Sequence, residues 1–87
     1  MTNVVISKFC DNEKLNAESC VRIDMKKRNA IFGYLIKGSD YEYLMAKNFW
    51  RIVVHSNIAA WKKTNNPEIA KIYNGAEFLK LSVVALP

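Results

Sequence analysis

Two neighbouring β-type runs limit most strongly what this chain can fold into. Residues 21–25 alternate apolar and polar side chains, and residues 30–36 are rich in β-branched and aromatic side chains. The connection between them, Lys26-Lys27-Arg28-Asn29, is polar and contains an asparagine, which is typical of turns. We therefore predict a β-hairpin over residues 21–36, with three successive cations at its tip.

A chain of 87 residues has room for one domain, which we predict to span residues 1–87. Hydrophobic residues make up 51% and charged residues 24% of the sequence, as in ordinary globular proteins, so we expect a packed core. No apolar run reaches the ~20 residues needed to cross a bilayer. The N-terminus lacks the pattern of a secretory signal, and we expect a cytoplasmic protein that does not enter a membrane.

Local patterns add further strands and helices. Residues 4–9 form a short β-rich run, and residues 77–84 alternate as a half-buried strand does. Ser56 can cap one short helix, and Pro67 fits the first position of a second helix. We predict an α+β fold, in which an antiparallel sheet of about five to six short strands forms a meander or a partly open barrel, with one or two short helices before the last strand.

Residues 41–54 fit either a helix or two strands. The motif at residues 39–42, Ser-Asp-Tyr-Glu, matches a capping box, and apolar side chains of the segment fall near one helical face. Against a helix, aromatic and β-branched residues dominate, and residues 46–48 could turn the chain. Residues 49–54 are also poor helix formers, so we favour a hairpin with strands at 41–45 and 49–54.

Groups that could support catalysis or metal binding are scarce. His55 is the only histidine, and the three glycines form no phosphate-binding loop. Cys10 and Cys20 fit best as reduced, partly buried thiols. Asp40 and Glu42 lie at a turn, where capping or solvated carboxylates are common. We predict a non-enzymatic protein that needs no metal and no cofactor.

Aromatic and basic residues are interleaved between residues 28 and 63, which hold seven of the ten aromatic residues. If residues 30–54 form a three-stranded meander, alternation places many of these rings on one sheet face together with Arg51. Rings on an open sheet face can stack on the bases of single-stranded nucleic acid, while cations hold the phosphates. The residues that we predict to contact nucleic acid or another partner are Lys26, Lys27, Arg28, Phe32, Tyr34, Tyr41, Tyr43, Lys47, Phe49, Trp50 and Arg51.

The same rings also fit two different arrangements. Helices around Trp61 and Tyr73 could cover them, which would make them a second core layer. If residues 41–54 are helical instead, an exposed helical face would form the contact surface. Its members would be Tyr43, Lys47, Trp50 and Arg51.

Residues 28–36 resemble in part the aromatic RNA-binding strand of RNA-recognition and cold-shock domains. They lack the glycine after the basic residue and the regular aromatic spacing of that strand. We therefore assign the chain to no family.

Positive charge is concentrated in the second half of the chain. Residues 1–43 carry seven Lys and Arg against six Asp and Glu, whereas residues 44–87 carry six against two, within a net charge of +5. Such a field attracts nucleic acid or an acidic protein surface. The alternative function is therefore a small interaction or inhibitor protein that docks on an acidic partner. The ten lysines and nine asparagines are typical of AT-rich genomes and suggest an accessory protein of a mobile element.

An exposed sheet edge offers one more partner. An unpaired first or last strand could pair with the same strand of a second copy, which would give a homodimer.

Overall fold

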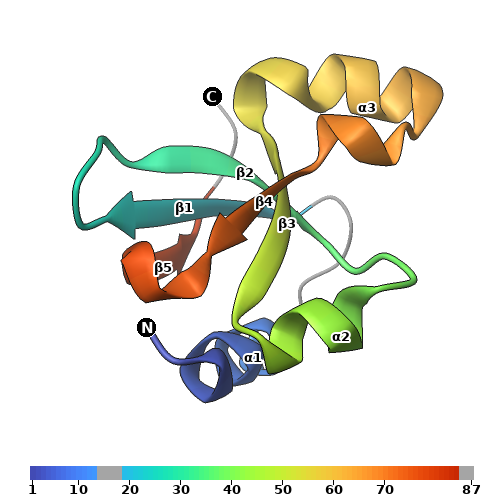
Figure 1. The fold of residues 1–87 in the computed structure, drawn as a ribbon. Coiled ribbons are helices and arrows are strands. Elements are labelled where there is room, and N and C mark those ends of the chain that lie inside the picture. The colour runs from blue at the N-terminus through green and yellow to red at the C-terminus, as the bar shows by residue number, and fades with distance from the viewer. Residues whose placement is uncertain (14–18, 85–87) are drawn as a thin grey trace.

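The computed structural model describes residues 1–13 and 19–84. It contains a five-stranded antiparallel sheet with the order β4-β3-β2-β1-β5 (Figure 1). The strands are β1 (Cys20–Met25), β2 (Ile31–Ile36), β3 (Phe49–Val54), β4 (Lys71–Asn74) and β5 (Phe78–Val83). The α-helices are α1 (Asn3–Asn12), α2 (Tyr41–Ala46) and α3 (Ile58–Thr64), and the short 3-10 turns are η1 (His55–Asn57), η2 (Pro67–Ile69) and η3 (Gly75–Glu77). The α+β fold, the antiparallel sheet and a helix before the last strand are confirmed.

The predicted β1–β2 hairpin is confirmed. Its ladder pairs Cys20 with Tyr34 and Ile23 with Ile31, which leaves residues 26–30 as the tip. The carbonyl of Glu77 accepts a 2.9 Å hydrogen bond from the Lys26 amide, so the tip is anchored to η3. The predicted last strand is also confirmed as β5, which pairs with β1.

Residues 4–9 belong to helix α1, so the prediction of a strand there is wrong. The Thr2 hydroxyl accepts a hydrogen bond from the Val5 amide and caps the helix. Ile6 and Cys10 lie four residues apart on the same helical face, and both are fully buried in the core. Burial of this face outweighs the weak β preference of the valines and isoleucine.

Residues 41–54 are divided between the two predicted structures. The strand predicted at 41–45 is wrong, since Tyr41–Ala46 is helix α2, whereas the strand at 49–54 is confirmed as β3. Asn48 has a φ of 61°, in the left-handed region where asparagine is tolerated, and it reverses the chain between the two elements. The capping box predicted at residues 39–42 would have Ser39 as its cap, but the N-cap of α2 is Asp40, whose side chain makes no capping hydrogen bond.

The segment after β3 is partly as predicted. Helix α3 is confirmed, and Asn65 ends it with a φ of 52°. The second predicted helix is reduced to the η2 turn, because Lys71–Asn74 extends along β3 as strand β4.

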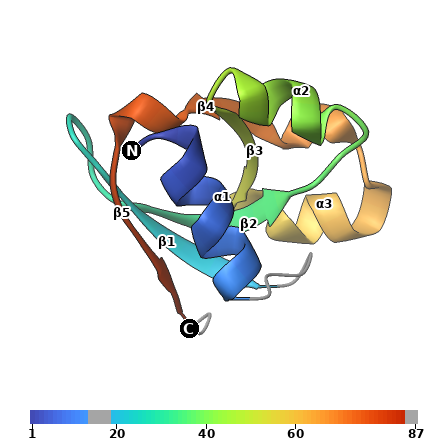
Figure 2. The same cartoon turned by 90° about the horizontal axis from the view of Figure 1, so that it is seen from below.

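Helices cover both faces of the sheet. On the inner face, the side chains of Trp50 and Ile52 join a core cluster with Ile6 and Cys10 of α1. On the outer face, Val53 joins a second cluster, which α3 covers. Figure 2 shows α1 in front of the inner face, and in Figure 1 α3 lies at the other end of the molecule from α1 and α2. No helix within residues 1–13 and 19–84 is long and apolar enough to span a bilayer.

Candidate functional site

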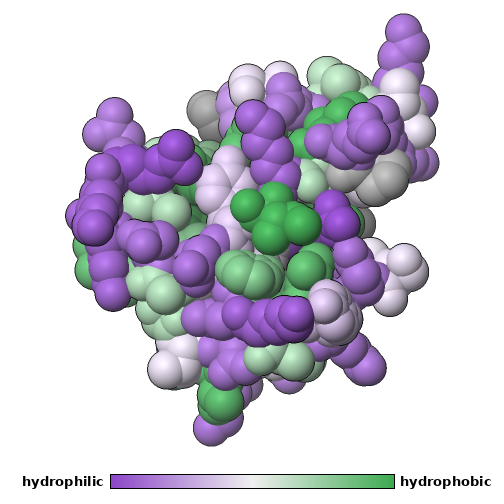
Figure 3. Space-filling view, in the orientation of Figure 1, coloured by the Kyte–Doolittle hydropathy of each residue, from purple (hydrophilic) through white to green (hydrophobic). Residues whose placement is uncertain are grey.

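A groove separates the tip of the β1–β2 hairpin from the edge strand β4, and we call it the basic groove. Its volume is about 440 Å³. Met25, Lys27 and Arg28 line it from the hairpin, Lys71–Asn74 lines it from β4, and Glu77 closes it from η3. Figure 3 shows hydrophilic side chains over the hairpin tip and a hydrophobic patch beside them over β4.

The groove carries an excess of positive charge. Lys27, Arg28 and Lys71 are exposed on its two walls, and Glu77 is the one carboxylate among its described lining residues. None of the three cations forms an ion pair with another residue of the described chain. Unpaired cations on facing walls concentrate a positive potential between them, which attracts an anionic partner.

Strand β4 presents unpaired backbone groups to the groove. The Gly75 amide donates a 2.8 Å hydrogen bond to the Asn48 carbonyl, in register with the pairing of Tyr73 with Trp50 and of Lys71 with Ile52. Because hydrogen-bonded pairs alternate in an antiparallel ladder, Lys71 and Tyr73 direct their backbone groups toward β3. The N–H and C=O groups of Ile72 and the N–H of Asn74 then point away from β3, whereas the Asn74 carbonyl belongs to the start of the η3 turn. Within the described residues no strand pairs with β4 on that side.

Two of the predicted contact residues, Tyr34 and Trp50, have buried rings. Trp50 is 1% exposed, and its Nε1 donates a 2.9 Å hydrogen bond to Asn48 Oδ1. Tyr34 does not lie on an open sheet face, since it is 2% exposed in the outer cluster that α3 covers. The alternative of a second core layer therefore holds for Tyr34, and neither ring is open to a partner in this structure.

Tyr41 and Tyr43 lie on α2 rather than on the sheet. The Tyr41 ring meets the Trp50 ring edge-on at a centroid distance of 5.9 Å, and burial raises the pKa of Tyr41 to about 12. Tyr43 is 63% exposed, and its hydroxyl accepts a 2.8 Å hydrogen bond from Lys47 Nζ. Tyr41 thus belongs to the core, and Tyr43 and Lys47 form a local pair on the surface of α2.

Phe32 and Phe49 share the outer sheet face but occupy different parts of it. Phe32 pairs with Arg22, whose guanidinium carbon lies 5.6 Å from the ring centroid. Phe49 is half-buried at the start of β3, where it pairs with Asn74. The predicted rings are therefore dispersed over the sheet and α2, and they do not form one stacking platform.

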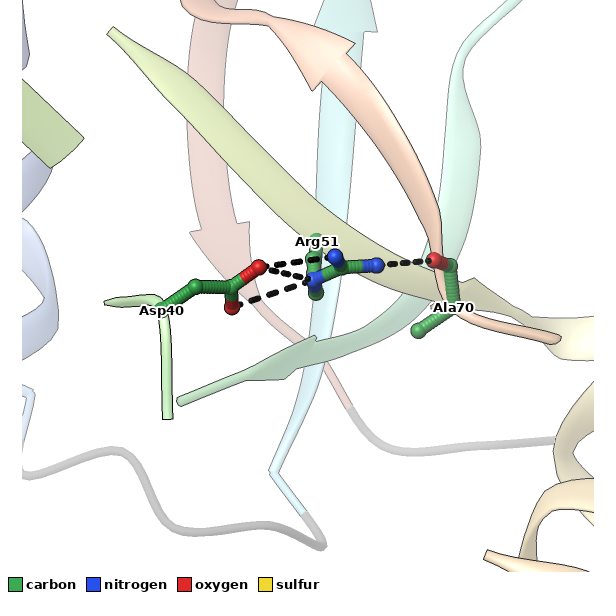
Figure 4. Close-up of polar contacts among 3 residues, drawn as sticks. All are labelled: Asp40, Arg51 and Ala70. Atoms are coloured by element: carbon green, nitrogen blue, oxygen red, sulfur yellow. Dashed lines mark hydrogen bonds and ion pairs between the residues drawn. The ribbon is translucent and has the colours of Figure 1, made fainter. Parts of the chain in front are cut away.

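The Arg51 side chain forms an ion pair and a hydrogen bond with other residues of the chain (Figure 4). Its guanidinium donates to both carboxylate oxygens of Asp40, with the shortest distance, 2.7 Å, from Nη2 to Oδ2. Its Nη1 also donates to the Ala70 carbonyl at 3.4 Å. The guanidinium holds the pKa of Asp40 below its usual range, and the carboxylate raises the pKa of Arg51.

Two of the three predicted cations at the hairpin tip line the basic groove. Lys27 and Arg28 line it, whereas Lys26 is exposed at the tip but does not line it. Sequence reasoning misses the β4 residues because residues 67–74 suggest a helix. The alternation of Lys71, Ile72 and Tyr73 is the signal that favours a strand, and it is too short to decide.

The cysteines lie on opposite faces of the sheet and are both free and buried. Burial is the main cause that raises the pKa of the Cys10 and Cys20 thiols. The described part of the chain contains no group of three or more His, Cys, Asp or Glu residues that could hold a metal ion.

Neither the protein-family models, the curated proteins nor the solved structures contain a match to this chain. The assignment of a function therefore depends on the geometry of the basic groove.

Proposed function

We propose that the protein is a small non-enzymatic binding module that docks an acidic surface of a partner protein in the basic groove. The observation that carries this proposal is the convergence of Lys27, Arg28 and Lys71 from two elements around one groove, in which Glu77 is the one carboxylate among the described lining residues. The three cations have no intramolecular ion pair in the described chain. A carboxylate of a partner would supply the missing counter-charge.

The apolar part of the groove favours a protein over a nucleic acid. Ile72 is 48% exposed beside the cations, and Met25 contributes to the opposite wall. Protein interfaces combine such apolar contacts with a charged rim. Binding of single strands depends instead on exposed rings for base stacking, and the ring among the described lining residues is that of Tyr73, which packs partly into the core.

Single-stranded nucleic acid is the second candidate. It is favoured by the presence of Tyr73 next to three cations that could bind the phosphates of a nucleic-acid backbone. It differs from the first candidate in a measurable way, because stacking on Tyr73 would change tyrosine fluorescence and an acidic peptide would not stack.

Charge reversal inside and outside the groove tests the proposal. The groove variant is Lys27→Glu/Lys71→Glu, and the control is Lys62→Glu/Lys63→Glu on exposed positions of α3. Both variants lower the net charge from +5 to +1, so a loss of binding that comes from net charge alone would be equal in the two. Fluorescence anisotropy with a labelled acidic peptide of about eight residues measures Kd at low and moderate salt.

We expect the groove variant to weaken peptide binding by about tenfold or more, and the control to change Kd by less than about threefold. An equal loss in both variants would show that only net charge matters and would contradict the proposal, as would a wild-type protein that does not bind the peptide. A poly-dT oligonucleotide that binds more tightly than the peptide at moderate salt and changes tyrosine fluorescence would transfer the assignment to nucleic acid.

A further inference from the structure

We infer that an extended acidic segment of the partner binds by adding a strand to β4, a mode that rests on the proposed function and specifies its geometry. The partner segment would lie in the basic groove between β4 and the hairpin tip. Its backbone would bond to β4 and its side chains would meet the groove cations.

The backbone of β4 is ready for such a strand. The N–H and C=O groups of Ile72 and the N–H of Asn74 point away from β3, as the register of the β3–β4 ladder requires, and both residues line the groove. The Asn74 carbonyl is not available, because Asn74 is the N-cap of the η3 turn. An edge strand with free donors and acceptors is a template for one more strand. Peptides recognised in this way gain affinity from main-chain hydrogen bonds and specificity from alternate side chains.

Side-chain alternation defines the chemistry of the segment. Lys71 and Tyr73 lie on the inner side of β4 with Trp50 and Ile52, their partners in β3, whereas Ile72 lies on the outer side. An added strand would place alternate residues next to Lys71 and the hairpin cations, and the intervening residues next to Ile72. The segment that fits best alternates acidic and apolar residues.

A second copy of this chain is a poorer occupant. Pairing of β4 with another β4 would bring two sets of Lys27, Arg28 and Lys71 to one interface. Like charges in neighbouring strands are destabilising, and among the described lining residues only Glu77 offers each groove a carboxylate. The charge of the groove therefore selects an acidic partner.

Amide hydrogen exchange tests the added strand directly. The probe is a peptide of alternating glutamate and valine, and exchange is followed by NMR on the full-length wild-type protein with and without it. We expect the peptide to slow exchange at the Ile72 and Asn74 amides by about tenfold or more, whereas the Lys71 and Tyr73 amides are already protected by β3 in the free protein. Unchanged exchange at Ile72 and Asn74 in a peptide-saturated sample would overturn the inference.

A proline variant provides an independent measurement. Ile72→Pro removes the outward N–H without removing a bond to β3, and proline is tolerated on a sheet edge when its N–H would face away from the ladder. Its matched control, Ile72→Ala, keeps the amide. We expect Kd for the peptide to rise by about tenfold in Ile72→Pro relative to Ile72→Ala.

The outcomes separate this inference from the proposed function. Equal affinity of the two Ile72 variants, combined with a large loss in Lys27→Glu/Lys71→Glu, would overturn strand addition and leave the acidic partner in place. A wild-type protein that does not bind the peptide would overturn both. If Ile72→Pro does not fold, as judged by circular dichroism, the exchange experiment on the wild-type protein decides alone.

Discussion

Arg51 holds three parts of the chain together through one guanidinium group. From the outer face of β3 it contacts Asp40, in the loop before α2, and the Ala70 carbonyl, in the segment before β4. Planar paired donors suit a carboxylate, so this contact fixes geometry as well as charge. The pair thereby positions β4, and with β4 one wall of the basic groove.

The pH dependence of stability should report this ion pair. Since the pKa of Asp40 is lowered in the folded protein, its ionised form stabilises the fold above the ordinary aspartate pKa, and this contribution is lost as pH falls through the folded-state pKa. We expect Asp40→Asn to lower the urea midpoint at pH 7. The difference from wild type should shrink as the pH is lowered below about 4. A difference that stays constant with pH would contradict the role of the charged form.

Strand β2 depends on a glycine at its contact with β3. A Cβ atom on Gly33 would collide with the backbone carbonyl of Val53, which cannot move without breaking the ladder. At Gly38 the nearest atom is Asp40 Oδ1 at 3.4 Å, an ordinary contact, so this glycine provides a control.

We expect Gly33→Ala to lower the free energy of unfolding by about 2–3 kcal/mol and Gly38→Ala to change it by less than about 0.5 kcal/mol. Urea denaturation of both variants measures the difference. Comparable stabilities for the two variants would show that the sheet can adjust at Gly33 and that the close approach does not constrain the fold.

At the scale of elements, the hairpin was predictable from the sequence and the placement of other segments was not. Strands β1 and β2 are neighbours in the chain, so alternation and a polar tip suffice to predict their pairing. Helix α1 has a β-rich composition, and it is helical because Ile6 and Cys10 reach a core built by residues far along the chain. Burial against residues that are distant in the sequence cannot be predicted from the local sequence pattern.

In the candidate site, too, the residues that neighbour one another in the sequence were predictable, and the residue that joins them through long-range pairing was not. Lys27 and Arg28 are predicted as candidate contact residues from the hairpin alone, and they line the groove. Lys71 is not, because it joins them only through the pairing of β4 with β3. The prediction of Tyr34 as a contact residue rests on an open sheet face, and that of Trp50 on a helix over residues 41–54. A flat ring between basic residues has the same sequence pattern whether it lies in a core or on a surface.

At the scale of the whole molecule, the proposed binding of an acidic partner depends on where the positive charge lies more than on the total net charge. The second half of the chain supplies Lys71 to the groove, while the hairpin of the first half supplies Lys27 and Arg28. The fold thus gathers cations from both halves at one place, next to exposed apolar surface and a free strand edge. An acidic extended partner would match all three properties.

Chemical-shift mapping tests the central claim most directly. In a titration of the labelled wild-type protein with the acidic peptide, we predict the largest amide shift changes at Lys27, Arg28 and Lys71–Asn74, because these residues line the basic groove. The exposed Lys62 and Lys63 of α3 serve as an internal comparison for non-specific attraction by positive charge. Largest changes at Lys62 and Lys63, or changes of equal size at all exposed cations, would contradict the claim that the groove is the binding site.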